Sequence, residues 1–77
     1  MLANTIAKSI TEQINKEFYS AYLYLDMANY YAGKGLLGYE NWFKVQAQEE
    51  MNHAMLMRQY LQNNGHGVTL GALADPT

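Results

Sequence analysis

The sequence predicts an all-α protein whose architecture is one long antiparallel helix hairpin. Three observations support this fold class. Two long segments carry apolar residues at helical spacing, a glycine-rich break separates them, and 77 residues are enough for one small domain only. We expect a single unit over residues 1–77, with a helix at about 4–32, a loop at 33–38, a helix at about 39–64 and an extended tail at 65–77.

The first predicted helix contains no Gly or Pro, and Asn4 or Thr5 is expected to cap its start. Its apolar residues recur every three or four positions: Ile6, Ile10, Ile14, Phe18, Ala21, Leu25 and Ala28. Further apolar residues lie on its other faces. A helix that is apolar nearly all round is a buried helix, so we expect this one to pack against more than its hairpin partner.

Three glycines within residues 33–38 interrupt the helical pattern and predict the loop. The second helix follows with its own stripe, which is Phe43, Ala47, Glu50, Ala54, Met57 and Leu61. It is expected to end at Asn63-Asn64-Gly65, where Gly65 suits the left-handed cap conformation. The tail after it has no clear period, and His66 within it is expected to be solvated.

The composition excludes several classes of function. Charged residues make up 16% of the chain, the net charge is −2 and there is no basic run, so we expect neither nucleic acid nor an anionic membrane as a partner. No segment approaches the ~20 apolar residues of a membrane span, and the N-terminus turns polar too early for a signal peptide. With no Cys, disulfides and thiolate metal sites are excluded. We expect a cytoplasmic protein.

Two carboxylates interrupt the apolar stripes. Glu17 lies on the row of Ile14 and Ala21, and Glu50 lies between Ala47 and Ala54. A charged carboxylate within an apolar stripe is costly to desolvate unless it is neutral, paired or bound to a metal.

His53 follows Glu50 by three residues and therefore lies on the same helix face. The midpoint between positions 17 and 50 falls at the start of the glycine loop, so the two Glu residues should be level to within about one turn of 5.4 Å. Each residue alone is more often a solvated or structural side chain. Together they predict half of a di-metal carboxylate site, because a helix bundle can converge such Glu and Glu-x-x-His ligands in its core.

The neighbouring residues allow weaker assignments. Tyr24 is seven residues after Glu17, and its spacing is equally compatible with a hydrogen-bond donor to a ligand and with a core tyrosine. Gln13, Gln46 and Gln48 are expected to be exposed polar side chains. The methionines 51, 55 and 57 and Trp42 are expected to serve in packing.

Two segments, KEFYSAYLYLDMANYY and AQEEMNHAMLMRQYLQNNGHGV, closely resemble the first two helices of bacterial non-haem ferritins. The resemblance implies a four-helix bundle with a short fifth helix, of which this chain is half, assembled into a homo-oligomeric cage of 24 subunits. It also implies ferroxidase activity, in which Fe(II) is oxidised by O2 or peroxide at a di-iron centre and stored as ferric mineral.

The resemblance also assigns roles to residues. Glu17 resembles the terminal carboxylate of the first iron site, Glu50 the carboxylate that bridges both irons, and His53 the imidazole ligand of the first iron. Tyr24 resembles the tyrosine beside the centre, and Glu49 resembles a ligand of a nearby third iron site. Carboxylates and imidazole suit iron, and their mutual repulsion should raise their pKa values without metal.

The chain departs from the family in its length, because the ligands that the third and fourth helices contribute are missing. Either it is a piece of a longer ferritin, which the segment 68–77 favours, or two hairpins pair so that each contributes Glu17, Glu50 and His53. Two other functions remain open. One is a non-catalytic helical association module with a structural polar network. The other is a di-iron peroxidase of the rubrerythrin type, which the absence of Cys disfavours.

Overall fold

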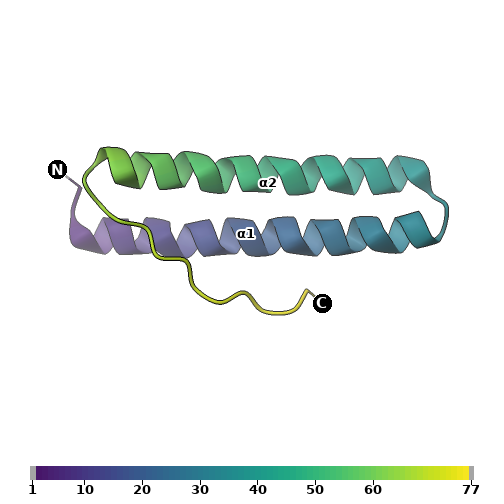
Figure 1. Cartoon of the computed structure of the whole chain (residues 1–77), viewed down its shortest axis with the longest axis horizontal. Coiled ribbons are helices and arrows are strands. Elements are labelled where there is room, and N and C mark those ends of the chain that lie inside the picture. Colours follow the sequence, from purple (N-terminus) through teal and green to yellow (C-terminus); the bar gives the residue numbers. More distant parts are fainter. Residues whose placement is uncertain (1, 77) are drawn as a thin grey trace.

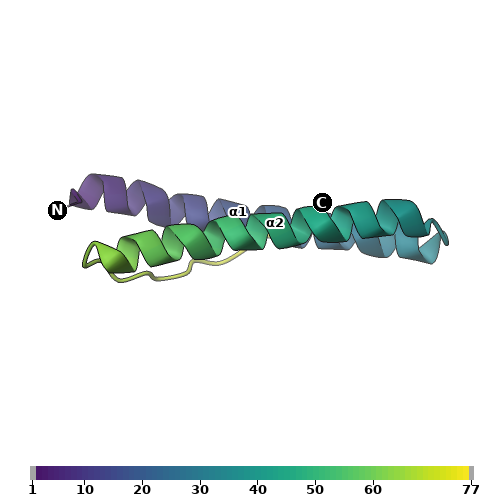
Figure 2. The ribbon, with the colours of Figure 1, turned by 90° about the horizontal axis from the view of Figure 1, so that it is seen from above.

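The computed structural model describes residues 2–76 and contains two long helices, α1 (Asn4–Gly33) and α2 (Leu37–Asn63). They lie side by side and antiparallel, with the tail crossing back over α1 (Figure 1). Seen from above, the helices cross at a shallow angle (Figure 2). The predicted all-α hairpin is therefore confirmed. The assignment of residues 1–77 to one domain stays a prediction, and Met1 and Thr77 lie outside the described residues.

The ends of α1 differ in how they are capped. The cap position is Ala3, which offers no side-chain hydrogen bond, so the expected cap by Asn4 or Thr5 is wrong. Both residues lie inside the first helical turn, where the Thr5 carbonyl accepts a bond from the Ser9 hydroxyl at 3.2 Å. At the other end Gly35 has φ +70°, and Leu36 N–H donates to the Tyr31 carbonyl at 3.0 Å.

The second helix begins at Leu37, two residues before its predicted start. Gly38 lies inside the first turn of α2, and its φ is not positive, so it takes part in the helix and not in the loop that was predicted. At its end Gly65 has φ +79° and His66 N–H donates to the Leu61 carbonyl at 3.0 Å, which confirms the predicted left-handed cap.

The fully buried residues between the helices are mostly alanine. The buried residues recur every seven positions on each helix: Ala7, Ile14, Ala21 and Ala28 on α1, and Ala47, Ala54 and Leu61 on α2. We call this row the alanine seam. In the antiparallel register Ala7 lies level with Leu61 and Ile14 with Ala54, so a large side chain faces a small one, and these four residues form the buried core cluster.

Most of the larger apolar side chains lie outside the alanine seam. At least a third of the surface is exposed on Ile6, Tyr22, Leu25, Met27, Tyr30, Leu37, Trp42, Val45, Met55, Leu56 and Tyr60, among others. The hairpin is also thin, with Cα extents of 49 × 20 × 13 Å. It is thus a single layer of helices, and the prediction that α1 is apolar beyond its hairpin contact is consistent with this exposure. Within residues 2–76 no helix is both long and apolar enough to cross a membrane.

The tail is held against α1 by one asparagine. Gly71 N–H donates to Asn15 Oδ1 at 3.1 Å, and Asn15 Nδ2 donates to the Ala72 carbonyl at 3.4 Å. Nearer α2, the His66 ring contacts the Leu2 carbonyl through Nε2 at 3.0 Å and is only partly exposed. The expectation of a solvated His66 is therefore wrong, because this hydrogen bond ties the ring to the start of the chain.

Candidate metal centre

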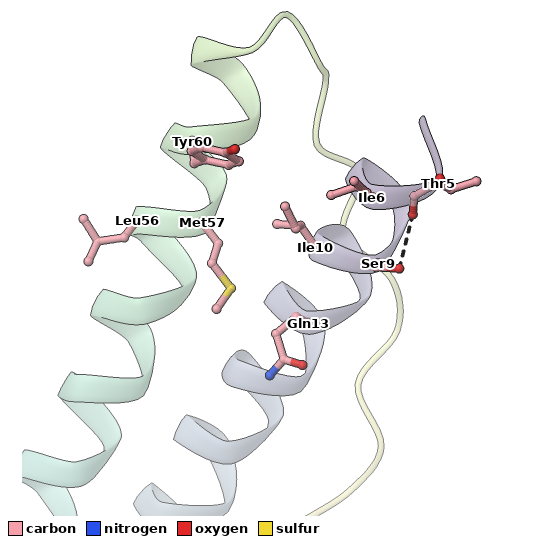
Figure 3. Close-up of a pocket in the computed structure, with 8 residues that line it drawn as sticks. All are labelled: Thr5, Ile6, Ser9, Ile10, Gln13, Leu56, Met57 and Tyr60. Carbon is pink, nitrogen blue, oxygen red and sulfur yellow. Dashed lines mark hydrogen bonds between the residues drawn. The ribbon is translucent and has the colours of Figure 1, made fainter. Parts of the chain in front are cut away.

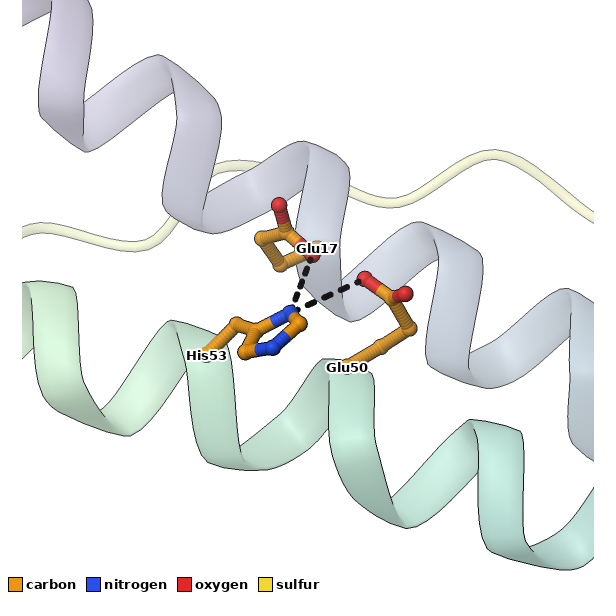
Figure 4. Close-up of side chains that lie close together, drawn as sticks. All are labelled: Glu17, Glu50 and His53. Atoms are coloured by element: carbon orange, nitrogen blue, oxygen red, sulfur yellow. Dashed lines mark ion pairs between the residues drawn. The ribbon is translucent and has the colours of Figure 1, made fainter.

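The structure brings Glu17, Glu50 and His53 together halfway along the hairpin. Each offers one ligand atom, and these atoms all lie within 4.8 Å of one another. Glu17 comes from α1, whereas Glu50 and His53 come from successive turns of α2 and face it (Figure 4). Glu17 and Glu50 therefore lie at the same height along the hairpin, as predicted.

The imidazole of His53 stands between the two carboxylates. Its Nδ1 lies 3.7 Å from Glu17 Oε2 and 3.7 Å from Glu50 Oε2. The carboxylate side chains are 14% and 22% exposed, and that of His53 is 54% exposed. The donors therefore lie at a surface of the hairpin, where the carboxylates are mostly buried and the ring of His53 is exposed.

The two carboxylates form one titrating unit. A hydrogen bond between them lowers the pKa of Glu17, with help from Gln13 and His53, and the same bond raises the pKa of Glu50. Partial burial and the charge of Glu17 raise the pKa of Glu50 further. The expected rise thus occurs at Glu50 only, because the neutral form of Glu50 can donate to a charged Glu17, which favours the charged form of Glu17.

Gln13 supports this pair and was missed as a functional residue. Its Nε2 donates to Glu17 Oε1 at 3.0 Å, one helical turn before the ligand. Sequence reasoning placed Gln13 among the exposed polar residues, which it is, but its i, i+4 spacing from Glu17 is the signal that could have identified the contact.

Two other predicted site residues lie outside the three-residue group. Tyr24 is partly buried about 10 Å along α1 from Glu17, and its ring centroid lies 6.1 Å from that of Phe43. Glu49 is exposed, and as the neighbour of Glu50 it is turned about 100° around α2 from it. Tyr24 and Glu49 therefore stand outside the group of three ligand residues, and their roles at the site stay predictions.

The donor set suits a cation of intermediate hardness. Two carboxylates and one neutral imidazole are ligands that iron, manganese and zinc accept in proteins. With a cation bound between Nδ1 and the carboxylates, the neutral ring would carry its proton on Nε2. Three donors on one side of an ion leave the opposite side for further ligands. The site thus fits iron, with part of the coordination to be supplied by other groups.

Comparisons with known proteins agree on one family. The ferritin-like domain model matches residues 7–77. The chain is 40% identical over 65 residues to a bacterial non-heme ferritin of Bacteroides fragilis, which covers 84% of the chain and 41% of that relative. It is 34% identical over 76 residues to a probable bacterial non-heme ferritin-like protein of Haemophilus influenzae, covering 99% and 46%.

Solved structures match over the whole hairpin. An open pore ferritin from Archaeoglobus fulgidus superposes with a TM-score of 0.95 and 43% identity, over 100% of this chain and 48% of that one. A humanized archaeal ferritin gives a TM-score of 0.97 with 40% identity, over 100% and 47%. The chain therefore spans about half the length of the relatives that it matches.

Proposed function

Because the chain belongs to the ferritin family, whose domain model matches residues 7–77, we propose that it binds Fe(II) at Glu17, Glu50 and His53 and serves in iron storage. The observation that carries this proposal is the convergence of three metal-type donor atoms from two helices within 4.8 Å. We further propose a ferroxidase reaction, in which Fe(II) is the substrate and O2 or peroxide accepts its electrons.

Each ligand has a distinct role in this proposal. Glu17 is the terminal carboxylate, Glu50 is placed to bridge two ions, and His53 contributes Nδ1. A cation at the cluster would favour the charged form of both carboxylates, because its positive charge would offset the repulsion that raises the pKa of Glu50. Gln13 keeps Glu17 oriented through its 3.0 Å hydrogen bond.

Two residues have proposed roles at the edge of the site. Tyr24, partly buried along the same helix row as Glu17, is proposed to stand beside the iron centre. Glu49 is exposed next to Glu50, and we propose it as a ligand of a third iron ion. These two assignments rest on the ferritin resemblance.

We also propose that the protein works as a homo-oligomer. The large exposed apolar side chains of the single-layer hairpin support this proposal. Two assemblies follow from the considerations above, a 24-subunit cage on the ferritin pattern and a dimer of hairpins. The native mass distinguishes them directly.

A second candidate function is a helical association module without catalysis. It is favoured by the same exposed apolar side chains, and by the fact that His53 can pair with both carboxylates without a metal. In this case Glu17, Glu50 and His53 would form a structural polar network.

Anaerobic Fe(II) titration followed by air tests the metal proposal. We expect a stoichiometric rise in the absorbance of oxidised iron, which Glu50→Ala abolishes. Glu12→Ala is the matched control, since Glu12 is an exposed carboxylate on α1 outside the ligand group. If the assembled protein binds no iron, or if Glu50→Ala binds as well as the parent chain, the metal proposal is wrong and the association module remains.

A further inference from the structure

The end of α2 carries an asparagine that is followed directly by a glycine. The sequence contains seven asparagines, and only Asn64 has a glycine after it, which is Gly65. In such a pair the side-chain amide lies next to a backbone nitrogen whose own residue has no Cβ to shield it. This nitrogen can attack the amide, so the pair is a candidate site of spontaneous chemical modification.

Asn64 and Gly65 together form the cap that ends α2. Asn64 has φ −99° and ψ 16°, and Gly65 follows in the left-handed region at φ +79°. Gly65 is exposed, and a Cβ built there would meet no described atom within 4 Å. Figure 3 shows this end of α2 beyond Tyr60, where the chain leaves the helix and crosses toward the start of α1. Water and hydroxide can therefore reach the pair.

The reaction open to this pair is deamidation. The Gly65 nitrogen loses its proton to solvent and bonds to Cγ of Asn64, while the bond from Cγ to Nδ2 breaks. Nδ2 takes up a proton and leaves as ammonia, and a five-membered succinimide ring remains. Water then opens the ring at either carbonyl carbon, so that residue 64 becomes aspartate or isoaspartate. One neutral amide is thus replaced by one carboxylate, without an oxidant or a reductant.

The folded helix end holds both reacting groups away from each other. Asn64 Nδ2 donates to the Tyr60 carbonyl at 2.9 Å, and Gly65 N–H donates to the Gln62 carbonyl at 3.1 Å. Both hydrogen bonds must break before the nitrogen can attack the amide. Because helix ends open locally without unfolding of the whole chain, this step depends on the stability of the last turn of α2.

The backbone of Asn64 also directs the nucleophile away from the side chain. The succinimide ring contains the Cα–C bond of Asn64, so ring closure requires the Gly65 nitrogen to eclipse Cβ about that bond. At ψ 16° the Gly65 nitrogen is instead almost eclipsed with the backbone nitrogen of Asn64. The rotation of ψ that the reaction needs would break the cap bonds made by the N–H groups of Gly65 and His66.

We propose that Asn64 is a deamidation site controlled by the last turn of α2, protected while the cap is formed and converted when the cap opens. The proposal goes beyond iron binding and does not depend on it, because the three candidate metal ligands take no part in the reaction. Since two hydrogen bonds of ordinary strength must break, the folded chain should convert roughly tenfold to a hundredfold more slowly than the unfolded chain.

Conversion of Asn64 should in turn loosen the tail. The side chain changes from a hydrogen-bond donor into a carboxylate, which is repelled by the Tyr60 carbonyl and by the negative end of the α2 dipole. Isoaspartate also adds one carbon to the backbone between α2 and His66. His66 N–H donates to the Leu61 carbonyl, and the His66 ring contacts the Leu2 carbonyl at 3.0 Å. Opening of the cap therefore releases the contact between the tail and the start of the chain.

Mass spectrometry after incubation in heavy-oxygen water tests the proposal on the assembled protein. One oxygen of the new carboxylate comes from water, so the tryptic peptide that follows Arg58 reports the conversion. We expect the folded protein to convert Asn64 at least about tenfold more slowly than the same protein unfolded in urea. Asn63 is the internal reference, because Asn64 and not a glycine follows it, and in urea it should convert more slowly than Asn64.

Gln62→Gly separates protection by the fold from the chemistry of the pair. Gln62 is exposed in the last turn of α2, and a glycine there weakens the helix end while the Asn64–Gly65 pair stays intact. The conversion rate of the folded variant should rise about threefold, and its rate in urea should not change. Gln48→Gly is the matched control, because Gln48 is also exposed on α2 but lies far from its end, and both rates should equal those of the parent protein.

Asn64→Asp tests the effect of conversion on the tail. This variant should speed hydrogen exchange of the His66 amide at least about fivefold, because the bond to the Tyr60 carbonyl is lost. Asn63→Asp is the control for charge. It adds the same negative charge one residue earlier, but its carboxylate can still accept the bond from Gln59 Nε2, which is 2.9 Å long in the parent chain. Its effect on the exchange of the His66 amide should be smaller.

Three results would overturn the proposal. Equal conversion of Asn64 in the folded and the unfolded protein would show that the cap gives no protection. Conversion in urea that is no faster at Asn64 than at Asn63 would show that the pair is not reactive. Equal exchange of the His66 amide in Asn64→Asp and Asn63→Asp would show that the side-chain bond of Asn64 does not hold the tail. Each of these results leaves the outcome of the Fe(II) titration unaffected.

Discussion

Glu17 and Glu50 bring carboxylate oxygens within 4.8 Å of one another, although 33 positions separate them in the chain. The pKa of Glu17 lies below its ordinary value of 4.5 and the pKa of Glu50 lies above it. The pair contributes most to stability between these two pKa values, where Glu50 is protonated and Glu17 is charged. Above the pKa of Glu50 both carboxylates are charged and repel each other, with the Gln13 amide and His53 Nδ1 as their neighbouring polar partners.

The folding stability of the metal-free chain should depend on pH through the titration of Glu17 and Glu50. Because the folded pKa of Glu50 is raised, its contribution is complete below 4.5 and is lost as the pH rises through the raised value. Because that of Glu17 is lowered, its contribution is present above 4.5 and is lost as the pH falls through the lowered value. We expect the thermal midpoint, followed by circular dichroism, to decline on both sides of this window.

Glu50→Gln separates the two contributions. The amide cannot ionise and can still donate to Glu17, so the decline at higher pH should disappear while the decline at lower pH remains. Glu12→Gln removes an exposed carboxylate elsewhere on α1 and should leave the profile unchanged. If the thermal midpoint of Glu50→Gln still declines at higher pH, Glu50 is not the group that causes this decline.

Gln13→Ala should weaken Fe(II) binding by about threefold to tenfold with little change in stability. The substitution removes the hydrogen bond that orients Glu17 Oε1, and such a bond is worth about 0.5–1.5 kcal/mol. Anaerobic titration measures the effect. Gln48→Ala is the control, since Gln48 makes the same i, i+4 bond to Asn52 at 3.0 Å, away from the ligands. Equal effects of the two variants would contradict a role for Gln13 at the metal site.

Asn15→Ala and Gly71→Ala should release the tail to the same extent. A Cβ on Gly71 would lie 2.8 Å from Asn15 Nδ2, so the asparagine must rotate away and lose both of its bonds to the tail. We expect faster hydrogen exchange at residue 71 in either variant and no further acceleration in the double variant, because both remove one interaction.

Gly67→Ala provides the comparison for the tail. A Cβ at Gly67 meets nothing within 4 Å and the backbone needs no left-handed conformation there, so exchange at residue 71 should stay slow. Additive effects of Asn15→Ala and Gly71→Ala would mean that the asparagine clamp is not what holds the tail.

The glycines of the turn should respond in opposite directions. Gly35→Ala forces a side chain into φ +70° and should cost about 1 kcal/mol in the free energy of unfolding. Gly38→Ala lies within α2 with open space around its Cβ, and should add about 0.5–1 kcal/mol. Chemical denaturation of the two variants measures both values. If both substitutions change the free energy of unfolding in the same direction, this explanation of the turn is wrong.

The helix pattern was predictable because it is local. Apolar spacing located both helices, and the level placement of Glu17 and Glu50 followed from a short loop and a fixed rise per residue. The start of α2 was less predictable, since Gly38 can occupy either a loop or a helix and only its φ decides. The prediction of the N-cap was wrong for a similar reason. Asn4 and Thr5 have side chains that are common at caps, but both residues occupy helical positions.

Contacts made by the tail could not be foreseen. His66 and Asn15 find partners 64 and 57 positions away, and nothing in the spacing of an aperiodic segment signals such pairs. At the site, the sequence indicated that the carboxylates would repel but not which of them would have the raised pKa. The difference depends in part on Gln13, whose hydrogen bond lowers the pKa of Glu17 but not that of Glu50.

The alanine seam sets the distance between the two helices that carry the candidate ligands. Glu17 stands on one helix and its two partners on the other, so the breadth of a few methyl groups between the helices determines how far apart the ligands are held. Ala21, Ala47 and Ala54 therefore help to set the separation of the ligands without being ligands themselves. A larger side chain at one of these positions would spread the helices and move Glu17 away from Glu50 and His53 without replacing any donor.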